Sequence, residues 1–215
     1  LPDAGCARAG GVLMVANDRL HTVEAGSSAR AVGRMLGVLF PDAVTVLDVT
    51  YGNGRFWDGS ADVQVTGLDI LPDRAPDVCG DFTALPFLDG AVDLVIFDPP
   101  YLTDMSKSNP GRMGARFGSF ASIGQLRAAV QQGCREAWRV SRIGVIVKVQ
   151  NYGHASVSVR MTRWVEEIFP HDAYGEVHLA RSNKIQDRKW RDQLSVHSNS
   201  ATFLAYRHGD QRHIR

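Results

Sequence analysis

The chain has 215 residues, of which 44% are hydrophobic and 22% are charged, as is typical of one globular domain. No apolar run approaches the roughly 20 residues of a membrane-spanning helix, and the first ten residues lack the basic and apolar regions of a signal peptide. Three widely spaced cysteines argue against a disulfide framework, and seven histidines show no metal-binding spacing. We therefore expect a cytoplasmic protein without a metal site.

Charge is distributed unevenly along the chain, although the net charge is only +1. Residues 181–215 contain eight Lys or Arg and three Asp, a net charge of +5, and the preceding residues carry −4. A basic C-terminal segment on a mildly acidic body indicates a surface that faces phosphate groups, although a solvated charged tail would show the same pattern.

Strand and helix patterns alternate along most of the chain. The elements expected, in chain order, are a helix from Ser27 or Ser28 to the break at Pro41, strands at 44–49, 63–70, 78–81 and 92–97, a helix at 123–140, a strand at 143–149, a helix at 157–169, and strands at 174–179 and 201–206. This order predicts a single α/β domain over residues 1–215, with a doubly wound, mostly parallel sheet and an antiparallel C-terminal hairpin.

Acidic residues stand at or just past the ends of four predicted strands. They are Asp48, Asp69, Asp81 and Asp98. The loops at the carboxyl ends of parallel strands hold ligands in sheets of this kind, so the four acids predict a site. Each acid alone has a structural explanation, since Asp48 can cap a helix and Asp81 can begin a turn.

A glycine-containing loop, DVTYGNGRF at residues 48–56, follows the first of these strands. Gly52 and Gly54 permit a tight turn and close approach of the backbone to a ligand. The loop is not a dinucleotide-binding fingerprint, because Trp57 stands where the third glycine would be, and no GK[ST] of a phosphate-binding P-loop follows.

The acids beyond this loop suit a nucleoside ligand without a phosphate. Asp69 is placed to bind the two hydroxyls of a ribose, and Asp81 with Phe82 to meet an adenine amino group and ring. S-adenosyl-L-methionine fits this description. The cofactor-binding residues we predict are Asp48, Thr50, Tyr51, Gly52, Asn53, Gly54, Phe56, Asp69, Ile70, Asp81 and Phe82.

The segments DVTYGNGRF, LD, GDF and FDPPY, in this order, resemble those of the class I S-adenosylmethionine-dependent methyltransferases that modify exocyclic amines of nucleobases. The resemblance covers residues 27–150 and is greatest to the N6-adenine DNA enzymes, with N4-cytosine enzymes as relatives. It implies a Rossmann-like fold, S-adenosyl-L-methionine as cofactor and S-adenosyl-L-homocysteine as product. RNA enzymes that methylate adenine N6 or guanine N2 stay open as alternatives, as does a catalytically silent nucleic-acid-binding subunit.

The segment Asp98-Pro99-Pro100-Tyr101 carries the predicted chemistry. The Asp98 carboxylate and the Pro99 carbonyl would accept the two N–H groups of the target amine and free its lone pair. Two prolines stiffen the turn that holds both acceptors, and Tyr101 offers a face for an unstacked base. Cytosine-C5 methylation is disfavoured because it needs an activated nucleophilic cysteine, typically in a Pro-Cys pair, and the three cysteines here follow Gly5, Val78 and Gly133.

Basic residues predict contacts with the nucleic acid, for which we favour DNA over RNA. The predicted substrate-binding residues are Lys107, Arg112 and Arg116 in the loop 103–122, Lys148 at the end of the fifth strand, and Lys184, Arg188, Lys189 and Trp190. Lys148 has a second interpretation as the ion-pair partner of a nearby acid, and Trp190 as a core residue. We expect no separate target-recognition domain between Asp81 and Asp98 or after Arg207, so specificity would need these segments, a terminus beyond this sequence, a partner protein or a homodimer.

Overall fold

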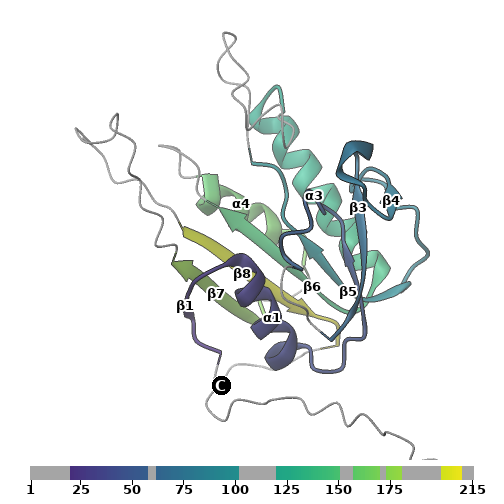
Figure 1. The fold of residues 1–215 in the computed structure, drawn as a ribbon. Coiled ribbons are helices and arrows are strands. Elements are labelled where there is room, and N and C mark those ends of the chain that lie inside the picture. The colour runs from purple at the N-terminus through teal and green to yellow at the C-terminus, as the bar shows by residue number, and fades with distance from the viewer. Residues whose placement is uncertain are drawn as a thin grey trace, which may run out of the picture.

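The computed structural model describes residues 20–57, 62–101, 120–150, 157–169, 173–180 and 200–209 (Figure 1). The elements are β1 (Val23–Ala25), α1 (Ser28–Leu39), β2 (Thr45–Asp48), β3 (Gln64–Asp69), the short 3₁₀ helix η1 (Pro72–Arg74), β4 (Val78–Cys79), β5 (Val92–Phe97), α3 (Ile123–Val140), β6 (Ser141–Gln150), α4 (Val157–Glu166), β7 (Gly175–Ala180) and β8 (Ser200–Arg207).

The strands form one eight-stranded sheet in the order β1-β7-β8-β6-β5-β2-β3-β4. Strand β8 runs antiparallel to both of its neighbours, β6 and β7, and the other paired strands are parallel. The predicted α/β class, mostly parallel sheet and antiparallel C-terminal hairpin are confirmed. The carboxyl ends of β2, β3 and β5 therefore meet at one edge of the sheet.

Helices cover both faces of the sheet, with α1 on one face and α3 and α4 on the other (Figure 1). Helix α1 begins where the sequence predicts, because Ser27 Oγ accepts a hydrogen bond of 3.2 Å from Arg30 N. The side chain of Ser122 caps α3 in the same way by accepting from Gln125 N at 3.2 Å. Amphipathic stripes on these helices seal the two cores against the strands.

The pleat of β5 sends alternate side chains to opposite faces and so fixes the direction of Asp98. Leu94 and Ile96 pack in the core on the α1 side, and Val95 and Phe97 in the core on the α3 side. In β6, Ile146 lies on the α1 side, two positions before Lys148. Asp98 and Lys148 thus both project toward the α1 side at the carboxyl edge.

Strand β1 was not predicted from the sequence. It has three residues and lies at the edge of the sheet, where Val23 pairs with His178 of β7. Its buried residue is Glu24, whose Oε2 accepts from Arg34 Nη1 of α1 at 2.6 Å. A strand with an inward-facing acid and no hydrophobic alternation gives no periodic signal.

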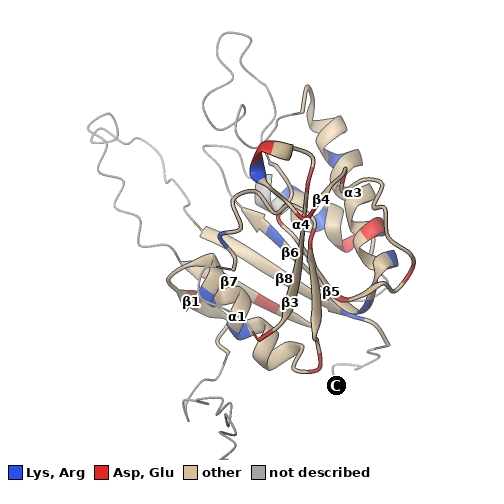
Figure 2. Ribbon diagram, turned by 45° about the vertical axis from the view of Figure 1, so that its right-hand side comes forward, with Lys and Arg blue, Asp and Glu red and all other residues tan. Residues whose placement is uncertain are grey.

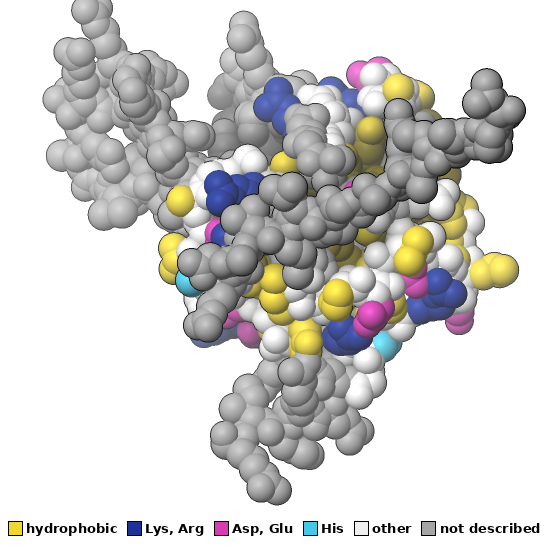
Figure 3. Space-filling model, turned by 60° about the horizontal axis from the view of Figure 1, so that its bottom comes forward, with side chains coloured by type: hydrophobic (Ala, Val, Ile, Leu, Met, Phe, Trp, Pro, Cys, Tyr) yellow, Lys and Arg dark blue, Asp and Glu magenta, His cyan; other side chains and the backbone are white. Residues whose placement is uncertain are grey.

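The described surface is mixed in character. Positive and negative residues are interspersed over its helices and strand ends (Figure 2). On the face shown in Figure 3, exposed hydrophobic side chains lie scattered among charged ones. Within the described ranges no helix has the length and apolarity needed to cross a bilayer.

Candidate functional site

The acids predicted as a group do lie along the carboxyl edge of the sheet. Asp48 ends β2 and Asp69 ends β3, while Asp98 directly follows β5 and Asp81 follows β4. Since β2 lies between β3 and β5, Asp48 is flanked by the strands that carry Asp69 and Asp98. Three carboxyl groups on adjacent strand ends give this edge several hydrogen-bond acceptors for a ligand.

Asp48 is the most buried of these acids, with 1% of its surface exposed. Its Oδ1 accepts from Thr50 N at 3.1 Å and its Oδ2 from Trp57 Nε1 at 2.9 Å. Burial raises the pKa of Asp48 to about 7, with smaller upward contributions from Asp98 and Asp69, against the lowering effect of the two hydrogen bonds. In the sequence, Trp57 argues only against a dinucleotide fingerprint, and no local pattern predicts its contact with Asp48.

The glycine loop is tied to Asp69. Gly52 and Gly54 have φ angles of 56° and 66°, a backbone conformation that favours glycine. The Asp69 carboxylate accepts from Gly52 N at 2.8 Å through Oδ2 and from Leu71 N at 2.9 Å through Oδ1. Because a carboxylate has about four acceptor sites, Asp69 can hold the loop and still bind two hydroxyl groups.

The ring of Tyr51 fills the space above two glycines. A Cβ atom added to Gly67 of β3 would lie 2.4 Å from Tyr51 Cδ2, and one added to Gly54 would lie 2.7 Å from its hydroxyl oxygen. The loop is also anchored through Tyr51 N, which donates to Leu68 O at 3.0 Å. The absence of side chains at these glycines therefore lets Tyr51 lie flat against β3.

The residues predicted to hold an adenosyl group lie on the same edge beyond this loop. Ile70, directly after Asp69, is 65% exposed and leaves apolar surface open at the end of β3. Phe82 packs against Phe97 with ring centroids 5.0 Å apart. Asp81 begins a turn in which its Oδ1 accepts from both the backbone N and the Oγ1 of Thr83, each at 2.8 Å.

Asp98 is held from two sides. Its backbone N donates to Thr50 Oγ1 at 2.8 Å, which joins the glycine loop to the Pro-Pro turn. Its Oδ2 forms an ion pair of 2.5 Å with Lys148 Nζ, and Lys148 also lies over the ring of Phe56, 5.3 Å from the centroid. Asp98 Oδ1 is buried and has no hydrogen-bond partner among the described residues. An acceptor left unpaired at this position indicates a place for a donor on a ligand.

The remaining predicted residues are placed as follows. Tyr101 packs against the core on the α3 side, and Asn53 Oδ1 accepts from Arg74 Nη1 at 3.0 Å. Lys148 belongs to the site but uses its ammonium group on Asp98, as the second interpretation of the sequence had it. The predictions for Lys107, Arg112, Arg116, Lys184, Arg188, Lys189 and Trp190 lie outside the described residues.

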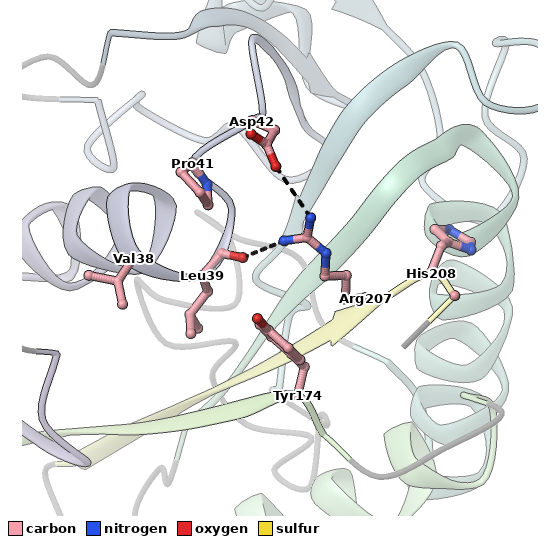
Figure 4. Close-up of a pocket in the computed structure, with 8 residues that line it drawn as sticks. Val38, Leu39, Pro41, Asp42, Tyr174, Arg207 and His208 are labelled. Atoms are coloured by element: carbon pink, nitrogen blue, oxygen red, sulfur yellow. Dashed lines mark hydrogen bonds and ion pairs between the residues drawn. The ribbon is translucent and has the colours of Figure 1, made fainter. Parts of the chain in front are cut away.

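A surface pocket lies at the opposite, amino edge of the sheet (Figure 4). Its central cation, Arg207, donates to Leu39 O at 2.9 Å and pairs with Asp42 at 3.4 Å. These contacts tie the end of β8 to the end of α1, so this pocket has a structural explanation. In the described part of the chain, no three His, Cys, Asp or Glu side chains are grouped so that they could hold a metal ion.

Neither a protein-family model nor a curated protein matches this sequence. Solved structures with a similar fold include a candidate rRNA methylase from Clostridium thermocellum, at 16% identity over 85% of this chain and 98% of that chain, with a TM-score of 0.47. A second is an rRNA methylase from Streptococcus thermophilus, at 13% identity over 85% of this chain and 97% of that chain, with a TM-score of 0.46. A third is the [4+2]-cyclase SpnF, at 15% identity over 83% of this chain and 81% of that chain, with a TM-score of 0.47. Similarity at this level concerns the fold alone, and the reaction has to be argued from the residues of this chain.

Proposed function

We propose that this protein transfers a methyl group from S-adenosyl-L-methionine to the exocyclic amine of a nucleobase, with adenine N6 in DNA as the leading substrate. The observation that carries the proposal is the buried Asp98 Oδ1, which has no hydrogen-bond partner in the described part of the chain and belongs to a carboxylate held by Lys148 at the start of a Pro-Pro turn. Cytosine N4 in DNA, and adenine N6 or guanine N2 in RNA, present the same kind of amine and are the alternatives.

The described residues fit the cofactor. Asp69 keeps acceptor sites for the ribose hydroxyls, exposed Ile70 and half-buried Phe82 offer apolar surface to the adenine, and Asp81 keeps its Oδ2 for the amino group. The three carboxyl groups at the strand ends supply acceptors for the polar groups of such a ligand. When bound there, S-adenosylmethionine supplies an electrophilic methyl group on a sulfonium.

Asp98 and Pro99 are assigned the activation of the amine. An exocyclic amine is a weak nucleophile because its lone pair is delocalised into the ring. Acceptance of one N–H by Asp98 Oδ1 and of the other by the Pro99 carbonyl favours a pyramidal nitrogen with a free lone pair. Asp98 Oδ1 is also placed to take the proton that the amine sheds when the new bond forms.

Lys148 is assigned a positioning role. By engaging Oδ2, its ammonium group leaves Oδ1 as the oxygen available to the amine. The Thr50 hydroxyl fixes the backbone of the same residue. The acceptor is thus preorganised before the base arrives, which reduces the cost of orienting it during the reaction.

The test is transfer of a labelled methyl group from S-adenosylmethionine to duplex DNA, ribosomal RNA and transfer RNA. We expect the wild-type protein to label DNA and Asp98→Ala to lose at least about a hundredfold in rate, because an activating acceptor is removed. Asp42→Asn is the matched control, since Asp42 lies at the opposite edge of the sheet and is well exposed. Equal labelling by wild type and Asp98→Ala would refute the assignment of Asp98, and labelling of RNA alone would replace DNA as the substrate.

A further inference from the structure

Gln150 is a second buried polar residue at the site that the proposed mechanism does not use. It ends β6, and only 8% of its surface is exposed. Its Oε1 is buried and makes no hydrogen bond among the described residues. Buried side-chain amides almost always have partners, so an unpaired one at a strand end indicates a ligand contact.

The fold places Gln150 beside the Pro-Pro turn. The last paired residues of β5 and β6 are Phe97 and Val147, and β6 continues to Gln150 while β5 gives way to the turn. Asp98, the residue after Phe97, forms an ion pair with Lys148, the residue after Val147, so the start of the Pro-Pro turn lies beside the end of β6. The buried end of β6 therefore lies beside the start of the predicted catalytic segment.

The alternation of β6 brings Gln150 to the same face as Asp98. Gln150 stands two residues after Lys148, so both side chains leave the strand on the α1 side. Their cross-strand neighbours on β8 are Ala201 and Phe203, which belong to the core on that side. Phe203 also contacts Phe56, with ring centroids 6.5 Å apart, which closes this face with apolar surface.

We propose that Gln150 is a specificity-determining residue, whose amide contacts the ring nitrogen next to the target amine. This inference rests on the proposed function. A side-chain amide carries a donor and an acceptor, and half a turn about its last bond exchanges them. With Oε1 as it lies, the amide would accept from the N–H of guanine, and after this half turn its NH₂ group would take that place and donate to the bare ring nitrogen of adenine or cytosine.

The apolar surroundings make this contact selective. Water has little access to the face that Gln150 shares with Phe56 and Phe203, so a base without a matching ring atom leaves the amide unpaired. A site built to pair a substrate group rejects an analogue that lacks it more strongly than an apolar pocket does.

The experiment crosses a protein change with a substrate change. The oligonucleotide carries the sequence that the wild-type protein methylates, either with the natural target base or with its analogue that has C–H in place of the ring nitrogen beside the amine. We expect wild type to lose about tenfold or more in kcat/KM on the analogue, as one buried hydrogen bond is removed. Gln150→Leu is expected to lose a similar factor on the natural base and to treat the two substrates alike.

Controls separate recognition from folding. Gln131→Leu changes a glutamine on α3 that bonds to Glu167, and it should discriminate between the substrates as wild type does. Cofactor affinity of Gln150→Leu, measured by calorimetry, is expected to stay unchanged, and Gln150→Met provides a second apolar variant of similar size. If Gln150→Leu loses the same factor in kcat/KM on the analogue as wild type does, the two losses are independent and Gln150 does not contact the ring nitrogen.

Gln150→Glu, assayed at increasing alkaline pH until its activity no longer changes, tells which ring atom is contacted, because burial favours the protonated acid and only the ionised carboxylate accepts without donating. For adenine or cytosine we expect it to lose as much as Gln150→Leu. Retained activity would keep the role of Gln150 and assign guanine as the base. A wild-type protein that transfers no methyl group to any nucleic acid would instead refute the proposed function itself.

Discussion

The ion pair between Asp98 and Lys148 links activity to stability at the level of single side chains. Lys148 is 4% exposed, so its removal leaves a mostly buried carboxylate without a counter-charge. We expect Lys148→Met to lower the free energy of unfolding by about 3 kcal/mol, measured with denaturant, and to reduce methyl transfer. Activity falls because the orientation of Oδ1 is no longer fixed.

The double variant Lys148→Met with Asp98→Leu provides the comparison. Removing both charges leaves neither buried alone, so most of the lost stability is expected to return while activity stays absent. If Lys148→Met has the same free energy of unfolding and the same rate of methyl transfer as wild type, the ion pair contributes neither to stability nor to activity.

Asp48 predicts a second residue-level effect, on the pH dependence of stability. Its folded-state pKa of about 7 lies above the ordinary value of 3.8, so the folded state holds this proton more tightly than the unfolded state. The free energy of unfolding is therefore expected to fall as the pH rises from about 4 to about 7, by up to about 4 kcal/mol, and to level off above that. Urea unfolding over this range measures it.

Asp48→Asn isolates the effect, because an amide does not titrate. The variant is expected to lose the slope between pH 4 and 7. Asp93 does not interfere in that window, since its hydrogen bonds from Thr45 and Val44 and its pairing with Arg142 lower its pKa to about 2, and its contribution is lost only as the pH falls below about 4. An unchanged slope in Asp48→Asn would assign it to another group.

At the level of elements, the glycine loop packs closely against β3 through Tyr51 and leaves no space for a side chain at Gly67. Gly67→Ala brings a methyl group to 2.4 Å from Tyr51 Cδ2, at the base of the ring where it cannot swing away. We expect lower cofactor affinity in calorimetry and a loss of about 1–3 kcal/mol in stability from this overpacking.

Gly33→Ala is the matched substitution. Gly33 lies inside α1 and its added methyl group meets nothing within 4 Å. It is expected to raise the free energy of unfolding by about 0.5–1 kcal/mol through helix propensity and to leave cofactor affinity unchanged. Equal losses in both variants would show that the Tyr51 contact is not the cause.

The elements that the sequence predicts best are those with a strong local signal. Helix α3 has the predicted bounds, Ile123–Val140, because a capping serine and an amphipathic stripe mark it. Strand β5 has the predicted bounds because its continuous apolar run stops at two prolines. Helix α4 ends at Glu166, short of the predicted Phe169, since Pro170 disfavours helical backbone just before it but does not fix which residue is the last.

The site was predictable as a set of strand ends but not as a set of contacts. The order of acids located Asp48, Asp69 and Asp98 on one edge, whereas their partners depend on strand order, which local patterns do not encode. Neither Trp57 nor Gln150 stands out in the sequence, because a side chain with a polar group after a loop or an apolar strand has many possible partners. Their contacts follow from the pleat and the register.

For the whole molecule, the two edges of the sheet have different tasks. The amino edge carries structural clamps, such as Asp93 with Arg142 at 2.6 Å and Arg207 with the end of α1. The carboxyl edge carries the unpaired acceptors. Substitutions at the first edge should change stability alone, and substitutions at the second should change ligand binding as well.

The basic residues of the C-terminal segment give a prediction at the same scale. Replacing Lys184, Arg188 and Lys189 with alanine removes three positive charges from a segment with a net charge of +5. If each contacts a phosphate, the slope of log affinity for DNA against log salt is expected to become shallower by about 0.9 per charge. Fluorescence anisotropy at several salt concentrations measures the slope, and a slope equal to that of wild type would contradict DNA binding by this segment.

The pairing of β1 with β7 has a consequence for the emergence of the chain from the ribosome. Val23 is a direct neighbour of His178, and β7 is joined to the rest of the sheet through β8, which ends at Arg207. During synthesis β1 therefore cannot pair until β7 and β8 have been made. Until then, part of the apolar face of α1 stays exposed to water. Contacts so distant in sequence form slowly, so the nascent protein is expected to depend on chaperones until the last strand has been made.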